Sequence, residues 1–140
     1  MDDPHAFQLE PQLEKDTVPI VDWHLCQVRL MNDSRYPWVI LIPKVPDIAE
    51  IHELAEEQQF LLLGESVRLS KALDQLFAPH KLNVAALGNM VRQLHIHHIV
   101  RFEDDASFPK PIWGVGEAVP YDSDVLHETV NGLRIALDLL

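Results

Sequence analysis

The order of helical and strand patterns along the chain limits its fold most. One long segment, ending near Phe77, carries apolar residues at helical spacing: Leu54, Leu62, Leu69, Leu73 and Leu76. The helix begins either at Pro46-Asp47 or near Glu56. Segments that alternate apolar and polar residues, as half-buried strands do, precede and follow it. Because these patterns do not alternate as βαβ units, we expect an α+β fold with one long helix packed across an antiparallel sheet.

Several short segments carry the strand pattern and predict a sheet of about five strands. They are residues 17–22, 25–31 and 39–42 before the long helix and residues 81–87 and 94–102 after it. The polar turn Asn32-Asp33-Ser34 joins the second segment to the third and predicts a hairpin. Towards the end of the chain, a C-terminal helix is predicted by apolar residues three or four apart: Leu126, Val130, Leu133 and Leu137.

Composition limits the class of partner. A chain of 140 residues fits one domain, and 47% hydrophobic residues suffice for a packed core. The 22 acidic residues outnumber the 11 Lys and Arg residues, which gives a formal net charge of −11. A binder of duplex DNA or RNA needs a basic footprint, so this charge argues against that class. A small phosphorylated ligand needs only a few local hydrogen-bond donors, so the negative net charge does not argue against such a ligand.

Targeting features and cysteine content point to the cytoplasm. The acidic start of the chain, residues 1–5, lacks the basic and apolar regions of a signal peptide. The longest apolar runs, residues 38–43 and 60–63, are far shorter than the roughly 20 residues that span a bilayer. The one cysteine, Cys26, excludes an internal disulfide and fits a reducing compartment. We therefore expect a cytoplasmic protein that does not enter a membrane.

Three of the eight histidines fall in the strand pattern at residues 93–100. Successive side chains of a strand point to opposite faces. One set is apolar apart from a histidine and is expected to face the core: Leu94, Ile96, His98 and Val100. The other set lies on the opposite face and presents an amide and two imidazoles in a row, with His95 at a surface-facing position: Gln93, His95, His97 and Ile99. Residues two apart on a strand lie about 6.6 Å from each other, so neighbours in this second set can converge on one phosphate-sized group.

Three interpretations of His95 and His97 are open: polar residues on a half-exposed strand, metal ligands, or catalysis at phosphorus. Two imidazoles on one strand are a common pair of metal ligands. The cupin metal pattern, however, has five residues between a Gly and His-x-His, and a Glu three or four residues after it. Neither Gly88 nor Glu103 stands at the required spacing. A long central helix also does not suit a jelly roll, so we expect no metal site.

The third interpretation depends on motifs spread over most of the chain. Residues 93–99 resemble the His-φ-His-φ-His-φ-φ motif of the histidine triad (HIT) superfamily, where φ is hydrophobic. Its three polar positions are occupied by Gln93, His95 and His97. The segments Lys81-Leu82-Asn83-Val84 and Gly88-Asn89 resemble the family's Asn-bearing strand and phosphate loop. Leu30-Met31-Asn32 and residues 39–44 resemble its N-terminal hairpin, and Trp113-Gly114 resembles the Trp-containing tail of some members.

This likeness, to bacterial-type HIT domain proteins, covers residues 17–114. It implies a HIT-like α+β fold for a single domain of residues 1–140, in which residues 115–140 form a C-terminal helical extension. Family members are usually homodimers, so a homodimer is the implied assembly.

HIT proteins that resemble this chain are nucleotide hydrolases or transferases that act at the α-phosphorus through a covalent nucleotidyl-histidine intermediate. The resemblance implies that His95 is the nucleophile and that His97 donates to a phosphate oxygen, with Gln93 as the third catalytic residue. An imidazole of ordinary pKa, about 6.5, is mostly neutral and nucleophilic near pH 7. The implied substrates are nucleoside phosphoramidates or dinucleoside polyphosphates. A purine nucleotide or nucleotide conjugate is thus the implied partner, and no cofactor is required.

The same resemblance implies residues that bind the rest of the nucleotide. Asn83 and Asn89 correspond to donors that contact phosphate oxygens. Asn32 stands where the family commonly places an acidic or amide residue on the ribose hydroxyls. Leu30 and Met31 are the implied walls of the base pocket.

Two positions depart from the HIT motif. Gln93 replaces the first histidine, and its amide can donate and accept hydrogen bonds but cannot carry a proton. If this change prevents turnover, the protein is a non-catalytic binder of purine nucleotides. His98 stands where the motif has an apolar residue, and its core-facing position predicts a buried, hydrogen-bonded ring. Beyond the strand, Asp104 and Asp105 are expected to form a solvated charge cluster.

Overall fold

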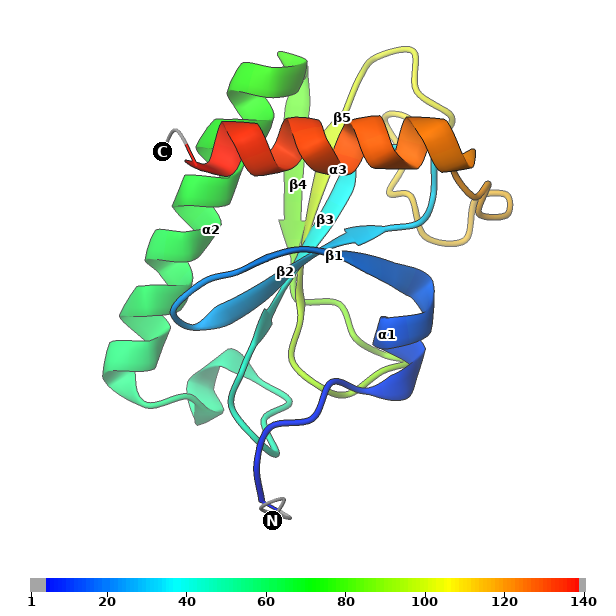
Figure 1. Ribbon diagram of the computed structural model, residues 1–140. Coiled ribbons are helices and arrows are strands. Elements are labelled where there is room, and N and C mark those ends of the chain that lie inside the picture. The colour runs from blue at the N-terminus through cyan, green and yellow to red at the C-terminus, as the bar shows by residue number, and fades with distance from the viewer. Residues whose placement is uncertain (1–4, 139–140) are drawn as a thin grey trace.

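An antiparallel sheet of five strands forms the centre of the computed structural model, which describes residues 5–138 (Figure 1). The strands lie in the order β1-β2-β3-β5-β4. Along the chain the elements are α1 (Pro11–Asp16), β1 (Thr17–Asp22), β2 (Cys26–Met31), β3 (Trp38–Pro43), the 3-10 helix η1 (Ile51–Glu53), α2 (Glu56–Phe77), β4 (Lys81–Ala85), β5 (Ile96–Arg101) and α3 (Ser123–Asp138). The expected α+β fold and both expected helices are confirmed.

Strands β4 and β5 are each shorter than their sequence patterns. Strand β5 begins at Ile96, so His95 lies at the end of the loop that leads into it. In the paired strands, Ile40 of β3 and Ala85 of β4 lie opposite His97. This register places His97 inside the sheet, between two neighbouring strands, and His95 at the edge of the same region.

Helix α2 begins at Glu56, the later of the two expected starts. The side chain of Gln58 accepts a hydrogen bond from the Ala55 N–H (2.9 Å), which satisfies a free donor at the helix start. Leu54 is buried but precedes the helix, and Leu76 is 42% exposed. The prediction of the apolar stripe is therefore correct for the middle of the helix, where Leu62, Leu69 and Leu73 are buried, and wrong at both ends.

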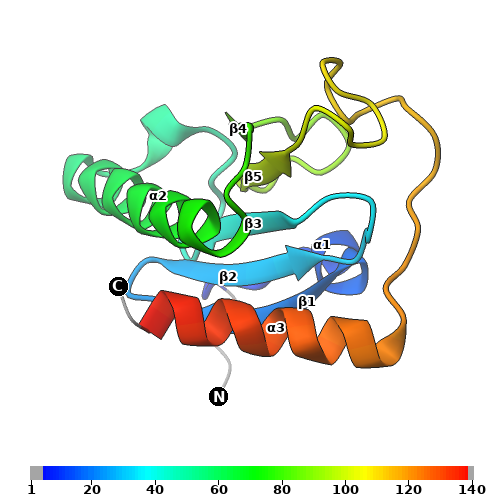
Figure 2. The same cartoon turned by 90° about the horizontal axis from the view of Figure 1, so that it is seen from above.

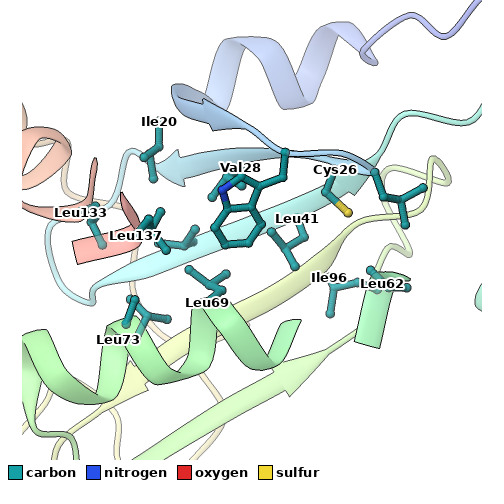
Figure 3. Packing of buried hydrophobic residues seen from close by; sticks show 14 of the residues in the cluster. Ile20, Cys26, Val28, Leu41, Leu62, Leu69, Leu73, Ile96, Leu133 and Leu137 are labelled. Carbon is teal, nitrogen blue, oxygen red and sulfur yellow. The ribbon is translucent and has the colours of Figure 1, made fainter. Parts of the chain in front are cut away.

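Helices α2 and α3 pack on one face of the sheet, which we call the helix-covered face. Seen from above, α3 runs alongside β1, and α2 lies nearer to β5 (Figure 2). Side chains of both helices meet strand side chains in one apolar cluster (Figure 3), which includes Val28, Leu41, Leu69, Leu73, Leu133 and Leu137. Burying a leucine or valine side chain contributes roughly 1.5–3 kcal/mol, so this cluster fixes both helices on the sheet.

A buried carboxylate closes the turn between β1 and β2. Glu65 of α2 accepts hydrogen bonds from the N–H groups of Leu25 and Cys26, each 2.9 Å long. The Cys26 side chain belongs to the cluster on the helix-covered face and is fully buried. Burial, together with the nearby Glu65 carboxylate, raises the pKa of the Cys26 thiol far above its ordinary range.

The histidine of β5 that faces the helices has partners for both ring nitrogens. His98 is fully buried. Its Nδ1–H donates to the Ile96 carbonyl (3.1 Å), and its Nε2 therefore accepts from the Ser66 hydroxyl of α2 (2.7 Å). Burial lowers the pKa of His98 to about 4. The prediction of a core-facing, hydrogen-bonded ring is confirmed.

The opposite face of the sheet, which we call the site face, is covered by irregular chain. The N-terminal segment, α1 and the chain beyond β5 pack there in a second apolar cluster: Leu13, Tyr36, Trp38, Ile40, Ile42, Ile99 and Ile112. On this face His95 is 6% exposed and His97 is 3% exposed. The expectation that His95 occupies a surface-facing position is therefore wrong, and His97 is covered as well. Strand alternation assigns a residue to a face, whereas the tertiary fold decides what covers that face.

A buried ion pair holds the loop that follows β5. The Arg101 Nε–H donates to Asp105 at 2.8 Å, and neither side chain is more than 3% exposed. The Asp105 carboxylate also accepts hydrogen bonds from backbone N–H groups of the loop, at Phe102, Ser107 and Phe108. Burial opposes ionisation, but the bonds from Arg101 and the backbone together outweigh it and lower the pKa of Asp105. The expectation of a solvated cluster is thus wrong for Asp105.

Candidate active site

A cavity of about 500 Å³ opens on the site face beside the two histidines. Its walls come from α1, the end of β2, the start of β3, the β4–β5 loop and the chain between β5 and α3. The lining includes His95, His97, Trp38, Trp113, Asn32 and Asn89. This volume and the mixture of apolar walls with a few polar groups are typical of small-molecule sites.

His95 is held as one defined tautomer. Its Nδ1–H donates to the main-chain carbonyl of Gln93 at 2.7 Å. In the neutral ring, Nε2 then carries a lone pair and no proton. Within residues 5–138, Nε2 has no hydrogen-bond partner. An imidazole in this state, at the wall of a cavity, is equipped to act as a nucleophile.

The loop before His95 requires a glycine at position 88. A Cβ atom added to Gly88 would lie 2.5 Å from the Val91 carbonyl oxygen and 3.1 Å from His95 Cε1. The first separation is shorter than real Cβ contacts, and the obstacle is backbone. The absence of a side chain therefore lets the loop pack directly against the His95 ring.

The neighbouring ring, His97, has no free nitrogen. The Trp38 Nε1–H donates to His97 Nδ1 (3.0 Å), so Nε2 bears the proton and donates to the Leu87 carbonyl (2.8 Å). Burial lowers the pKa of His97 to about 4, aided by His95 and His98 and opposed by the Leu87 bond. The ring is thus neutral near pH 7. In this arrangement it has no free proton for a phosphate oxygen, contrary to the role that the resemblance implies.

Aromatic rings surround His97 and form one wall of the cavity. Its ring centroid lies 4.8 Å from that of His95, 5.0 Å from that of Trp113 and 5.6 Å from that of Trp38. Trp38 and Trp113 meet edge to face at 6.2 Å. Such pairs stabilise a fixed geometry. The structure thereby gives Trp113 a place in the site, and Trp38 is a site residue that the sequence motifs did not indicate.

Three of the expected binding residues lie at the cavity: Asn32, Asn89 and Met31. The Asn32 side-chain oxygen accepts from the Tyr121 N–H (2.9 Å), which leaves its NH₂ group for a ligand. Asn89 is exposed at the rim.

Two expected binding residues lie elsewhere. The Asn83 side-chain oxygen accepts from Arg101 (2.8 Å), beside the ion pair of the following loop, and Asn83 is not among the residues that line the cavity. Leu30 is fully buried in the cluster on the helix-covered face. Adjacent strand residues point to opposite faces, so Leu30 cannot share a wall with Met31. The sequence-based assignment of Leu30 to a base pocket in this cavity is wrong.

The Gln93 side chain points away from this cavity toward the N-terminal segment. Its Nε2 donates to the Gln8 carbonyl and its Oε1 accepts from the Glu10 N–H, each at 2.9 Å. Gln93 instead lines a smaller cavity of about 280 Å³, which adjoins the first through His95 and Asn89.

The charged residues at the main cavity were not evident from the sequence. Lys15 and Asp16 come from α1, and Asp33 follows β2. Asp33 is held by Arg35 (2.9 Å). Burial opposes its ionisation, but hydrogen bonds from Arg35 and Val119 outweigh this effect and lower the pKa of Asp33. Only the tertiary fold brings Lys15 to the cavity that His95 also lines, since no local motif marks it.

Two negative findings hold for residues 5–138. No group of three or more His, Cys, Asp or Glu side chains is arranged to hold a metal ion in this part of the chain. None of the helices formed by these residues has both the length and the apolar character that crossing a membrane requires.

A five-stranded antiparallel sheet with a histidine pair on its site face defines an α+β protein of the histidine triad class. The HIT domain family model matches residues 12–104, and the chain belongs to this family. HIT-family proteins generally act on nucleotides, and many are hydrolases. Comparison with curated protein sequences gives no match.

Solved structures of similar proteins agree with this assignment. A histidine triad protein from Marinobacter aquaeolei VT8 is 48% identical, with a TM-score of 0.93 and coverage of 96% of this chain and 98% of that chain. A histidine triad protein from Bradyrhizobium japonicum is 41% identical (TM-score 0.92; coverage 94% and 98%). One from Sinorhizobium meliloti 1021 is also 41% identical (TM-score 0.90; coverage 93% and 96%).

Proposed function

We propose that the protein is a nucleotide hydrolase or transferase that acts at the α-phosphorus of a nucleoside phosphoramidate or a dinucleoside polyphosphate. The observation that carries this proposal is the state of His95, whose Nδ1–H is bonded to the Gln93 carbonyl and whose Nε2 is unpartnered within the described chain. The ring lines a cavity large enough for a nucleoside monophosphate. Phosphoryl transfer mainly requires that the reacting groups are positioned and that donors stabilise the charge on the phosphoryl oxygens.

The proposed reaction has two displacements at the same phosphorus. In the first, the Nε2 lone pair of His95 forms an N–P bond while the bond from phosphorus to the leaving group breaks, and the leaving group takes the bonding electrons and a proton from solvent. In the second, a water oxygen attacks phosphorus, the N–P bond returns its electrons to His95, and the water proton passes to solvent. The products are a nucleoside monophosphate and the free amine or nucleotide.

We assign the remaining cavity residues by position. Asn32, with a free NH₂ group, faces the ribose hydroxyls, and Met31 lies against the base. Asn89, at the rim beside His95, donates to phosphate oxygens. His97 holds the aromatic wall through its bonds to Trp38 and Leu87.

Activity is tested by incubating the protein with a nucleoside phosphoramidate and, separately, with a dinucleoside polyphosphate, and measuring nucleoside monophosphate by chromatography. The N–P bond of the covalent intermediate is acid-labile. The intermediate is therefore sought by mass spectrometry at neutral pH, without an acid step. We expect an adduct of one nucleotidyl group on His95 in the wild type and none in His95→Asn. Release of product by His95→Asn at the wild-type rate would contradict the proposal.

A non-catalytic purine-nucleotide binder is the second candidate. It is favoured by the engagement of both His97 nitrogens and by the direction of the Gln93 side chain, which leave His95 as the one triad ring with an unpartnered nitrogen in the described chain. Tight binding of a nucleoside monophosphate, without product or adduct from either substrate class, would support this candidate.

We further propose a homodimer in a reducing, cytoplasmic compartment. Exposed apolar side chains lie along one side of α2, with Phe60 67%, Leu63 64% and Val67 44% exposed. Contiguous exposed apolar residues are typical of protein interfaces. We expect Phe60→Glu to convert a dimer into a monomer in sedimentation equilibrium, whereas a wild-type monomer at micromolar concentration would contradict the proposal.

A further inference from the structure

We propose that Gln93 is a positioning residue, whose side chain holds the N-terminal segment, residues 8–16, at the edge of the nucleotide cavity. The proposal rests on the function proposed above. It gives the departure from the HIT motif a structural role in substrate binding, in place of contact with the transferred phosphate.

The Gln93 carboxamide pairs with the N-terminal segment as a peptide group would. It donates to the Gln8 carbonyl and accepts from the Glu10 N–H, each at 2.9 Å. An extended chain directs the carbonyl of one residue and the N–H of the second residue after it to the same side. A primary amide offers a donor and an acceptor side by side and satisfies both, whereas the two nitrogens of an imidazole point in diverging directions.

The same pairing determines where α1 begins. Glu10 is the N-cap residue of α1, and its carboxylate accepts from the N–H groups of Gln12 (2.7 Å) and Leu13 (3.2 Å). The bond from the Glu10 N–H to Gln93 therefore fixes the position of the N-cap residue of α1. Leu13, Lys15 and Asp16 of α1 all line the cavity that contains His95. Gln93 thus positions a wall of that cavity that includes Lys15.

The main chain of Gln93 acts on the nucleophile directly. Its carbonyl accepts the His95 Nδ1–H at 2.7 Å. Any residue at position 93 supplies such a carbonyl, whereas only the side chain makes the two bonds to residues 8–10. Replacing the side chain should therefore loosen the wall formed by α1 and weaken substrate binding, while the chemistry at His95 is largely retained.

Hydrogen exchange and steady-state kinetics of Gln93→Met test this inference. Methionine has a similar length and cannot make either hydrogen bond. We expect the amides of residues 10 and 12–16 to exchange at least about tenfold faster, the KM for a nucleoside phosphoramidate to rise about five- to tenfold, and kcat to change less than about threefold. Gln75→Met, at an exposed position of α2, is the matched control and should change none of these quantities.

Two further measurements test whether the effect of Gln93→Met is local and whether it depends on the two hydrogen bonds of the side chain. Amides of α2 report whether Gln93→Met loosens the whole fold; their exchange should stay at the wild-type rate. Gln93→Glu retains the acceptor for Glu10 but places a second oxygen at the Gln8 carbonyl, so its exchange rates should lie between those of the wild type and Gln93→Met.

Unchanged exchange at the amides of residues 10 and 12–16 in Gln93→Met would overturn the inference. A fall in kcat without a change in KM would also overturn it, since that result indicates contact with the reacting group. If the wild type binds no nucleotide, the proposed function fails, and the exchange measurement still decides whether Gln93 holds the N-terminal segment.

Discussion

The two faces of the sheet are covered in different ways, although the same strands supply both. On the helix-covered face, two regular helices pack leucines against the strands, and the β5 histidine on this side, His98, has both nitrogens bonded within the core. On the site face, irregular chain covers the strands and leaves a cavity of about 500 Å³ beside His95. Helices fill a face densely, whereas irregular segments can leave a shaped space and still satisfy their backbone through side chains such as Gln93 and Asp105. This contrast predicts that substitutions on the two faces affect different properties.

The largest effect is expected at His95. His95→Asn removes the unprotonated Nε2 and should lower kcat at least about a thousandfold, while the nucleoside monophosphate still binds. Circular dichroism and urea unfolding check the fold, and we expect a loss of less than about 2 kcal/mol in the free energy of unfolding because the ring lies at a cavity wall. A larger loss, with activity per folded molecule retained, would make His95 a packing residue like His98.

The next largest effect concerns the loop that covers the site face. Asp105→Asn breaks the buried ion pair with Arg101 and weakens the acceptor for three backbone N–H groups. Removing one partner of a buried pair typically costs about 3–5 kcal/mol of unfolding free energy. Urea unfolding measures the loss, and Asp104→Asn, at the exposed neighbouring position, should cost less than about 0.5 kcal/mol. Equal losses for both variants would show that the pair does not hold the loop.

The free energy of unfolding should depend on pH through the two buried histidines, His97 on the site face and His98 on the helix-covered face. The pKa values of His97 and His98 are both lowered to about 4, chiefly by burial. In the unfolded chain the imidazoles have their ordinary pKa, about 6.5, so between pH 6.5 and pH 4 the unfolded chain binds more protons. The free energy of unfolding should therefore fall as the pH falls through this window, by up to about 3 kcal/mol for each ring.

Urea unfolding at pH 7.5, 6, 5 and 4 checks this prediction. The fall should be about half as large in His98→Ala, which retains only His97. A free energy of unfolding that stays constant between pH 6.5 and 4.5 would mean that neither ring is held neutral by burial.

A smaller loss of stability should accompany His98→Ala at pH 7. The substitution leaves a cavity among apolar neighbours and removes the partner of the Ser66 hydroxyl, for a cost of about 2–3 kcal/mol. Activity per folded molecule should stay within about twofold of wild type, because the ring lies on the helix-covered face. A large loss of kcat in fully folded His98→Ala would break the separation of packing and chemistry between the two faces.

The smallest effect is expected for Gln93→His, which places a histidine at the position that resembles the first histidine of the HIT motif. The side chain at this position is directed toward residues 8–10 and not into the main cavity. The rate should therefore change by less than about tenfold, which corresponds to ~1.4 kcal/mol of barrier. A hundredfold increase on the same phosphoramidate or dinucleotide would show instead that an ionisable ring is needed and that the natural protein is a weakened enzyme or a binder.

The fold was largely predictable from the sequence because its signals are local. Strand alternation placed His98 in the core and His95 and His97 on the other face, and the C-terminal helix followed from apolar residues at helical spacing. Alternation also shows why Leu30 and Met31 cannot both line one pocket. The sequence does not reveal which distant segments cover a face, and so it predicted solvent where α1 and the later loop lie.

The candidate site was predictable only in part. The motif located His95, Asn32, Asn89 and Met31 at the cavity, because these positions follow from the strands and their connecting loops. Lys15 and Trp38 reach the same cavity through tertiary packing, which no local spacing encodes. Asn83 looked like a phosphate donor, but Arg101 engages its oxygen, and that pairing depends on the register of β4 and β5.

The buried Cys26 thiol makes the protein its own reporter of structural opening. A thiol reagent reacts with the thiolate, and the native state presents almost none of it because the side chain is fully buried and its pKa is raised. Cys26 can then be alkylated only when β2 and α2 separate. The rate of alkylation therefore measures how often this opening occurs, without any introduced cysteine. The same protection should keep a chain with one cysteine free of oxidative crosslinks for as long as it stays folded.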